Sequence, residues 1–395
     1  MRTRSRCRRV MLAVGLAVAT AALAACTSAP RPAPTSGSVG GAALPQTPPT
    51  TQVRWTRLPA VPGAAALTWV ASAGDQLLVS GTRGRGDAAP PGLWRGDGRH
   101  PWQPVDLAPV TYYGRRAVLF RVASDGRRVV ALGRRIGGAH GNARTTSWTG
   151  TPDALRESEQ PFEVFGGPDA IAVTDLAMTD DGALVLGAWA HRGDPSGVAV
   201  WRQQGDTWQR FDQAAGLRSE VTDVGSELTT PAAATSRGGE PVLVGWTVHL
   251  AGGEVGLRAS FWQPVGSGWQ EVPLPAGGDA QARAVACPTD ACTVAGSVAG
   301  RLAVWRVAGA DVTAVAVPVV AVGDREAVVA AAVGDAVWVS VTEGRASHLL
   351  VVEGLSVHPV SAPPGQVVAM AGGDAATALA REPDGTSSLW RAAAG

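Results

Sequence analysis

The sequence predicts an all-β protein built from a repeated unit, and three observations support that prediction. Short aliphatic runs alternate with Gly- and Asp-containing turns along most of the 395-residue chain, without a convincing long amphipathic helix. Trp provides 14 of the 21 aromatic residues and returns at one phase of the repeat. The chain has 50 Gly and 28 Pro without a collagen-like period, and its 45% hydrophobic content indicates a folded body.

Each unit begins with an apolar run that leads into a turn. The clearest turns are Gly74-Asp75, Asp125-Gly126, Asp181-Gly182, Gly334-Asp335 and Gly373-Asp374. An aliphatic second strand follows and ends in Gly, as in residues 77–81, 129–133, 183–187 and 242–245. Such short runs bounded by turn residues are typical of β-strands.

The third strand of each unit has an apolar marker residue. The markers are Trp94, Trp148, Trp201, Trp262, Trp305, Leu350 and Trp390. Residues 51–395 shared among seven units give about 49 residues per unit, the size of a propeller blade. We therefore predict a seven-bladed β-propeller. A pair of β-sandwiches would also show short strands and frequent turns, but the recurrent Trp phase favours the ring.

In four units a second apolar residue follows the marker after seven positions. The pairs are Trp201 and Trp208, Trp262 and Trp269, Trp305 and Val312, and Leu350 and Val357. Each pair has Gly at the second of its two central positions, which predicts a two-residue hairpin turn with the paired residues directly opposite each other.

The last unit lacks a fourth strand, because the chain stops shortly after Trp390. The missing pattern, Trp followed by an aliphatic residue three positions later, occurs at Trp55 and Leu58. We expect the N-terminal strand to complete the final blade and to close the ring, which leaves no open edge.

The N-terminal 25 residues have the layout of a signal peptide: five Arg without an acid, then a short apolar run. Leu23-Ala24-Ala25-Cys26 resembles the lipobox of bacterial lipoproteins. The resemblance implies cleavage before Cys26, lipidation of its thiol with a palmitate-type chain, and anchoring on the extracytoplasmic side of the cell membrane. An ordinary signal peptide with an incidental Cys26 is the alternative. Residues 26–50, rich in Pro, Ser and Thr, are expected to form a tether before the body at 51–395.

All 34 basic residues are Arg. Removal of the five leader arginines leaves 29 Arg against 33 acidic residues, a formal charge of −4 instead of +1. No basic stripe suited to nucleic acid remains, so we exclude that partner. The chain resembles the exported propellers found in actinobacterial lipoproteins, and we expect a monomer.

Cys287 and Cys292 occupy the first turn of the fifth unit, where other units have Asp and Gly. In an exported protein such a pair predicts a disulfide that staples the hairpin. A redox or metal role is the alternative, but no second pair completes a tetrahedral site.

Three histidines, His140, His191 and His249, follow the Gly that ends a second strand in consecutive units. Trp189 and Trp246 open two of the same segments. We expect these five residues on long loops at one face, where they are candidates for ligand contact. Convergent histidines can bind metal, but we favour exposed loop histidines and assign no metal or cofactor. Tyr112-Tyr113 and Arg115-Arg116 could line the mouth of the second unit.

A hydrolase resembling the sialidases is the competing function. Their propellers contain Asp boxes of the form S-x-D-x-G-x-T-W, and the fragments at 124–126 and 384–386 do not complete one. Asp175, Glu220, Asp223 and Glu326 lie near inner-strand starts and could converge. We assign no catalytic residue. The sequence favours a lipid-anchored propeller that binds a protein or glycan through loops on one face. A sensory accessory subunit of a membrane protein is a third hypothesis.

Overall fold

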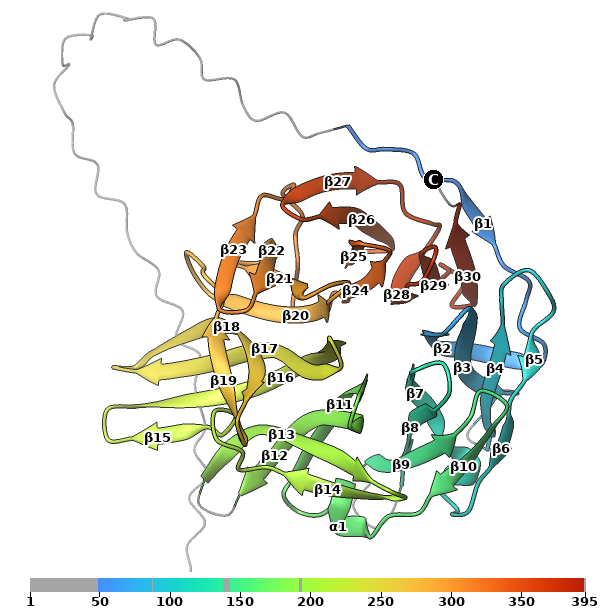
Figure 1. Ribbon diagram of the computed structural model, residues 1–395, viewed down its shortest axis with the longest axis horizontal. Helices are drawn as coiled ribbons and strands as arrows, with labels where there is room; N and C mark the ends of the chain where they lie inside the picture. Colours follow the sequence, from blue (N-terminus) through green and yellow to red (C-terminus); the bar gives the residue numbers. More distant parts are fainter. Residues whose placement is uncertain (1–48, 87, 138–142, 192–193, 394–395) are drawn as a thin grey trace, which may run out of the picture. The chain divides into compact units, whose positions relative to one another are not determined.

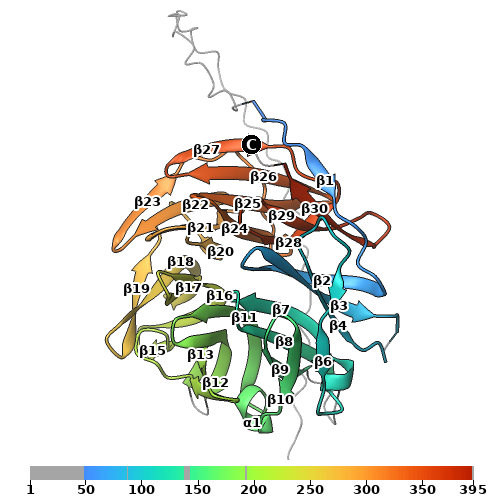
Figure 2. The same cartoon turned by 45° about the vertical axis from the view of Figure 1, so that its right-hand side comes forward.

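The structure is a computed structural model that describes residues 49–86, 88–137, 143–191 and 194–393. The body, Thr47–Gly395, contains seven sheets in a ring, which confirms the predicted seven-bladed β-propeller (Figure 1). The first strand of each blade lines the centre of the ring, and the next three lie progressively further out (Figure 2). No helix in the described ranges is long and apolar enough to cross a membrane.

The first three blades follow one another along the chain. Blade 1 contains β2 (Ala64–Ala73), β3 (Gln76–Arg83), β4 (Pro91–Gly96) and β5 (Gln103–Pro104). Blade 2 contains β7 (Val118–Ser124), β8 (Val129–Ile136), β9 (Ala143–Gly150) and β10 (Ala154–Ser158), with β6 (Asp106–Ala108) parallel to β10. Blade 3 contains β11 (Ala170–Thr179), β12 (Gly182–His191), β13 (Asp194–Gln204) and β14 (Thr207–Phe211).

The remaining blades complete the ring. Blade 4 contains β16 (Gly225–Arg237), β17 (Glu240–Ala251), β18 (Glu254–Val265) and β19 (Gly268–Pro273), with β15 (Glu220–Thr222) beside β16. Blade 5 contains β20 (Ala280–Ala286), β21 (Ala291–Val298), β22 (Arg301–Ala308) and β23 (Asp311–Val315). Blade 6 contains β24 (Val328–Val333), β25 (Ala336–Glu343), β26 (Ala346–Glu353) and β27 (Ser356–Val360). Blade 7 contains β28 (Gln366–Ala371), β29 (Thr377–Arg381), β30 (Ser387–Ala392) and β1 (Trp55–Arg57).

The third-strand markers form the hydrophobic core between neighbouring blades. Five of them are at most 1% exposed: Trp94, Trp148, Trp201, Trp262 and Trp305. Each packs in a cluster that includes residues of the preceding blade; Trp262 of blade 4, for example, packs with Leu184 and Leu186 of blade 3. The large indole area is thus buried at the blade interfaces, and this explains the unusual aromatic composition.

The predicted hairpin register is wrong by two positions. Trp201 lies opposite Arg210, and Trp208 lies opposite Gln203, so the two indoles are diagonal neighbours and not a direct pair. Gly205 is the first central residue of the turn, with φ of 61°, and not the second. A type II′ turn takes Gly at that first position. The hairpins after Trp262, Trp305 and Leu350 have the same arrangement.

The Gly near the middle of the second strand lies opposite a β-bulge in the first strand of the same blade. In blades 1 to 5 the bulge comes directly after the first-strand residue that pairs with this Gly. The glycines are Gly81, Gly133, Gly187, Gly245 and Gly296. In blade 4 a Cβ at Gly245 would lie 1.9 Å from the Thr230 carbonyl oxygen. The bulge brings the first strand this close, so only Gly fits at the position.

The ring closes where the N-terminal strand β1 pairs with β30, as predicted. Trp55 lies opposite Ala392, and Arg57 opposite Trp390. The Trp55 indole donates a hydrogen bond to the Ser361 carbonyl oxygen at 2.8 Å. In both views the blue β1 lies beside the dark red β30 (Figures 1 and 2).

Deletion of residues 51–60 should destabilise the whole body, because it exposes β30 and opens the blade 7 sheet. We expect a loss of about 3–5 kcal/mol in the free energy of unfolding, or roughly 10 °C in Tm. Calorimetry measures this, and deletion of residues 27–36 from the predicted tether is a control of equal length. A 51–60 deletion that melts like the full chain would refute the closure.

Gly245→Ala should lower the free energy of unfolding by about 1–3 kcal/mol, because the new methyl group meets a backbone oxygen. Gly277→Ala is the matched control: no atom lies within 4 Å of a Cβ there, so we expect a change below about 0.5 kcal/mol. Chemical denaturation of both variants tests the bulge explanation, and equal stabilities would contradict it.

Candidate functional site

The blades present two different faces. Because the strands of a blade alternate in direction, the turns between second and third strands lie on the same face as the connections between blades. We call this the connection face. Its inter-blade connections are residues 105–117, 159–169, 212–219, 274–279, 316–327 and 361–365. The turns between first and second strands form the other face.

The candidate ligand residues of blade 3 lie on a strand, because β12 continues past Gly187 to His191. Trp189 is 5% exposed and packs edge-on against Trp201, with ring centroids 6.1 Å apart. The Arg210 guanidinium lies 3.6 Å from the centre of the Trp189 ring. The Trp189 ring is therefore occupied by neighbours of its own blade. His191 ends β12, but its side chain is outside the described part, as is the whole of His140.

The corresponding residues of blade 4 also lie on a strand and not on a loop, because β17 extends to Ala251. Trp246 is half-buried. The His249 side chain is 52% exposed, and its Nδ1 lies 3.4 Å from Oε1 of Glu227, which is directly opposite on β16. Arg258 approaches Glu227 as well, at 3.5 Å. Within the described ranges no group of three or more metal-ligating side chains converges.

The central channel is a cavity of about 570 Å³ lined by the first strands of the blades. Arg121 of blade 2 forms an ion pair with Asp175 of blade 3, with 2.7 Å between Nε and Oδ1. The Ala234 amide of blade 4 donates to Oδ2 of Asp175 at 2.9 Å. The Arg121 guanidinium also lies 4.1 Å from the centre of the Trp69 ring of blade 1. One ion pair thus connects four blades.

Arg283 is the extra residue of the blade 5 bulge, and its side chain is 13% exposed. Nη1 donates to the Gly323 carbonyl oxygen at 2.7 Å, and Nε donates to Oε1 of Gln281 at 3.1 Å. Burial lowers the pKa of the Arg283 guanidinium, and the charges of Asp324 and Glu326 oppose that shift. This arginine connects blade 5 to the segment that precedes β24.

The four candidate carboxylates, Asp175, Glu220, Asp223 and Glu326, are not gathered in the channel. Asp175 is the one carboxylate among the described residues that line the channel. Glu220 lies on β15 and Asp223 directly after it, and both are exposed. Glu326 is half-buried before β24.

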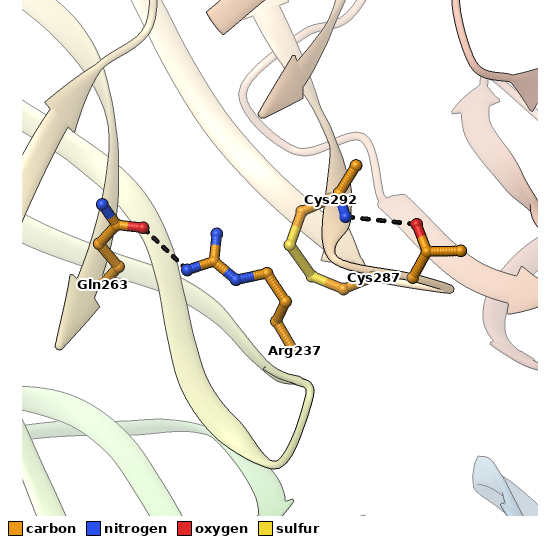
Figure 3. Close-up of a disulfide and its surroundings, with 6 residues drawn as sticks. Arg237, Gln263, Cys287 and Cys292 are labelled. Carbon is orange, nitrogen blue, oxygen red and sulfur yellow. Dashed lines mark hydrogen bonds between the residues drawn. A yellow bond between two sulfur atoms is a disulfide. The ribbon is translucent and has the colours of Figure 1, made fainter. Parts of the chain in front are cut away.

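The predicted disulfide is present between Cys287 and Cys292, in the turn that joins β20 to β21 (Figure 3). Cys287 lines the channel, whereas Cys292 is fully buried. Nearby, Arg237 donates to Oε1 of Gln263 at 2.8 Å (Figure 3). The bond ties the first two strands of blade 5 together at the end opposite the connection face.

A recess of about 530 Å³ lies on the connection face between blades 2 and 3. We call it the Arg144 recess, and its principal lining residues are Tyr112, Tyr113, Arg144, Gln160 and Phe162. The tyrosines belong to the connection before β7, as the sequence suggested, whereas Arg144 begins β9 and Phe162 begins α1 (Phe162–Phe165). The sequence did not point to Arg144 or Phe162. The connections that form the recess are about fifty residues apart in the chain, and no motif links them.

A buried carboxylate shapes one wall of the recess. Glu157 is 2% exposed, and its Oε2 accepts hydrogen bonds from the Val110 and Thr111 amides at 2.6 and 2.7 Å. Its Oε1 accepts from the Thr111 hydroxyl at 2.6 Å. A Cβ at Gly114 would lie 1.9 Å from this carboxylate, so the turn requires Gly there. These contacts hold the segment that places Tyr112 and Tyr113.

Arg144 is held in the recess by aromatic rings. Its guanidinium lies 3.9 Å from the centre of the Phe162 ring and 5.8 Å from that of Tyr113. Its Nε is buried and has no hydrogen-bond partner. The guanidinium is thus fixed in place by cation–π contacts.

The solved structures similar to this chain are β-propellers. The propeller domain of the Trilobed protease from Pyrococcus furiosus is 10% identical, with a TM-score of 0.50 over 84% of this chain and 94% of that one. Its topology is described as an open velcro, whereas β1 pairs with β30 here. The acylaminoacyl peptidase of Pyrococcus horikoshii is also 10% identical, with a TM-score of 0.52 over 85% of this chain and 52% of that one.

This chain therefore spans about half the length of that peptidase, and likeness at 10% identity shows the fold alone. No protein-family model and no curated protein matches the sequence. The chain is a seven-bladed β-propeller without a specific characterised family.

Proposed function

We propose that this protein is a lipid-anchored, extracytoplasmic binding protein that recognises a ligand or partner through the connection face of its propeller. The observation that carries this proposal is the Arg144 recess. It is concave, it combines four aromatic residues with Arg144, Gln160 and several Ser and Thr side chains, and it lies on the connection face. Recesses of this kind, on loops held by a rigid scaffold, are typical of binding sites.

The central channel also favours a binding function over a hydrolytic one. Both carboxylate oxygens of Asp175 have partners, Arg121 and the Ala234 amide, and these contacts hold blades together. A glycosidase of the common type uses two carboxyl groups within about 10 Å of each other. The described residues that line the channel supply one, so the channel does not offer such a pair.

The anchoring part of the proposal rests on the sequence around Cys26, which lies outside the described residues. Two fatty chains would give stable membrane attachment, where a single chain is marginal. Residues 26–50 would then separate the propeller from the membrane surface, so that the connection face is free to meet a partner.

Cys26→Ser should abolish labelling with a palmitate analogue and release the protein from the membrane fraction, because the thiol is the lipid acceptor. Cys7→Ser is the matched control, since Cys7 leaves with the signal peptide, and it should leave labelling unchanged. Gel fluorescence after metabolic labelling measures both. Unchanged labelling of the Cys26→Ser protein would rule out this anchor.

Photo-crosslinking in cells tests the binding face. A photoreactive phenylalanine analogue at Phe162 or Tyr112, both exposed on the connection face, should give discrete adducts. The same analogue at Asp335, exposed in a turn of the opposite face, should give none. Mass spectrometry identifies the adducts. Adducts from Asp335 but not from Phe162 or Tyr112 would contradict the assigned face.

A further inference from the structure

We propose that the Arg144 recess binds a small organic carboxylate with an apolar body, and that Arg144 is the residue that recognises the carboxylate. The inference rests on the proposed binding function and names the ligand class of the same site. Its starting point is an arginine that lies against aromatic rings in a concave site, and whose Nε has no hydrogen-bond acceptor among the described residues.

Glu157, Arg115 and Arg116, three other charged groups at or near the recess, have partners of their own. Glu157 accepts three hydrogen bonds from residues 110 and 111. Arg115 donates to the Val110 carbonyl oxygen at 2.9 Å, and Arg116 donates to the Tyr112 hydroxyl. Glu159 lies at the exposed rim. Within the described part of the chain, Arg144 is the one cation that lines the recess, and it has no ion-pair partner there.

The geometry around Arg144 favours a flat anion. Phe162 and Tyr113 contact the guanidinium through its π-system, which leaves the N–H groups in the guanidinium plane to act as donors. A guanidinium presents those donors in a planar fork that matches a carboxylate in two parallel hydrogen bonds. A carboxylate that enters the recess would give these donors an acceptor.

The rest of the recess suits an apolar body next to that carboxylate. Phe162 and Tyr113 line it together with Phe165, which lies on α1 and is 7% exposed. A volume of about 530 Å³ is within the range of sites for small molecules. Gln160 is less available, since its amide donates to the Ser158 and Asp206 carbonyl oxygens. The recognition would therefore combine one charged contact with aromatic packing.

The test is a calorimetric titration of the purified full chain with N-acetyl-L-phenylalanine. The matched probe N-acetyl-L-phenylalaninamide has the same body without the charge, and phenyl phosphate offers a different anion. We expect the acid to bind at least tenfold more tightly than either, because a carboxylate pairs with a guanidinium in two charge-assisted hydrogen bonds that the amide cannot make. Equal binding of the amide, tighter binding of phenyl phosphate, or no binding of the acid would overturn the proposal.

Variants separate recognition from folding. Arg144→Met keeps the apolar stem and should weaken binding of the acid at least tenfold, and Arg144→Lys should weaken it less because the charge remains. Phe162→Ala removes the ring against which the guanidinium packs and should also weaken binding. Arg202→Met is the control, because Arg202 lies over the Phe211 ring outside the recess. Tm values equal to that of the wild type show that the variants fold; unchanged affinity in a folded Arg144→Met protein would refute the role of Arg144.

The two proposals can fail separately. Tight binding of the acid without crosslinks from the connection face would leave the carboxylate site correct and the partner-binding function wrong. Crosslinks that persist unchanged in Arg144→Met, together with no binding of the acid, would leave the binding function correct and the ligand class wrong.

Discussion

The burial of one large side chain between neighbouring blades is the constraint on which this propeller depends. A single four-stranded blade cannot bury an indole on both sides, so the third-strand Trp of blades 1 to 5 packs against the blade before it. Blade 1 therefore needs blade 7 in contact with it, and the Trp94 cluster indeed contains Ala369 and Leu379 of blade 7. An open array would leave that interface in water, which is why the pairing of β1 with β30 stabilises every blade and not the last one alone.

A second constraint acts at the centre of the ring, where the first strands approach one another. The bulges in these strands redirect side chains toward the channel, and in blades 1, 3, 4 and 5 the Gly opposite the bulge makes room for a backbone oxygen of the first strand. Arg121 and Asp175 each follow such a bulge, and together they connect four blades by an ion pair, an amide hydrogen bond and a cation–π contact. The polar groups of the channel thus serve the assembly of the ring. The contacts between blades account for the charged pair Arg121 and Asp175 in the channel.

Much of the architecture could be read from the sequence because it depends on local patterns. The seven markers and the closing strand follow from spacing, and the Cys287–Cys292 bond follows from the position of the pair together with the predicted export. The register of the outer hairpins was wrong, because Gly can occupy either central position of a two-residue turn and the sequence does not say which turn type forms. Trp189 and His249 were expected on loops, but β12 and β17 extend beyond their Gly, and strand length depends on pairing that no short window reveals. The Arg144 recess could not be predicted, since two connections far apart in the chain form it.

The contrast between Arg121 and Arg144 is the physical argument behind the proposed recognition site. Both guanidinium groups lie against aromatic rings, so both are held in position. Arg121 also has Asp175 and a backbone carbonyl as partners, and its charge is used by the fold. Arg144 has the rings but no acceptor for its buried Nε. Folding tends to satisfy buried polar groups, so a fixed, unsatisfied cation in a concave surface is an interaction that the fold leaves incomplete. An external anion would complete it, and for that reason we place recognition at the connection face and not in the channel.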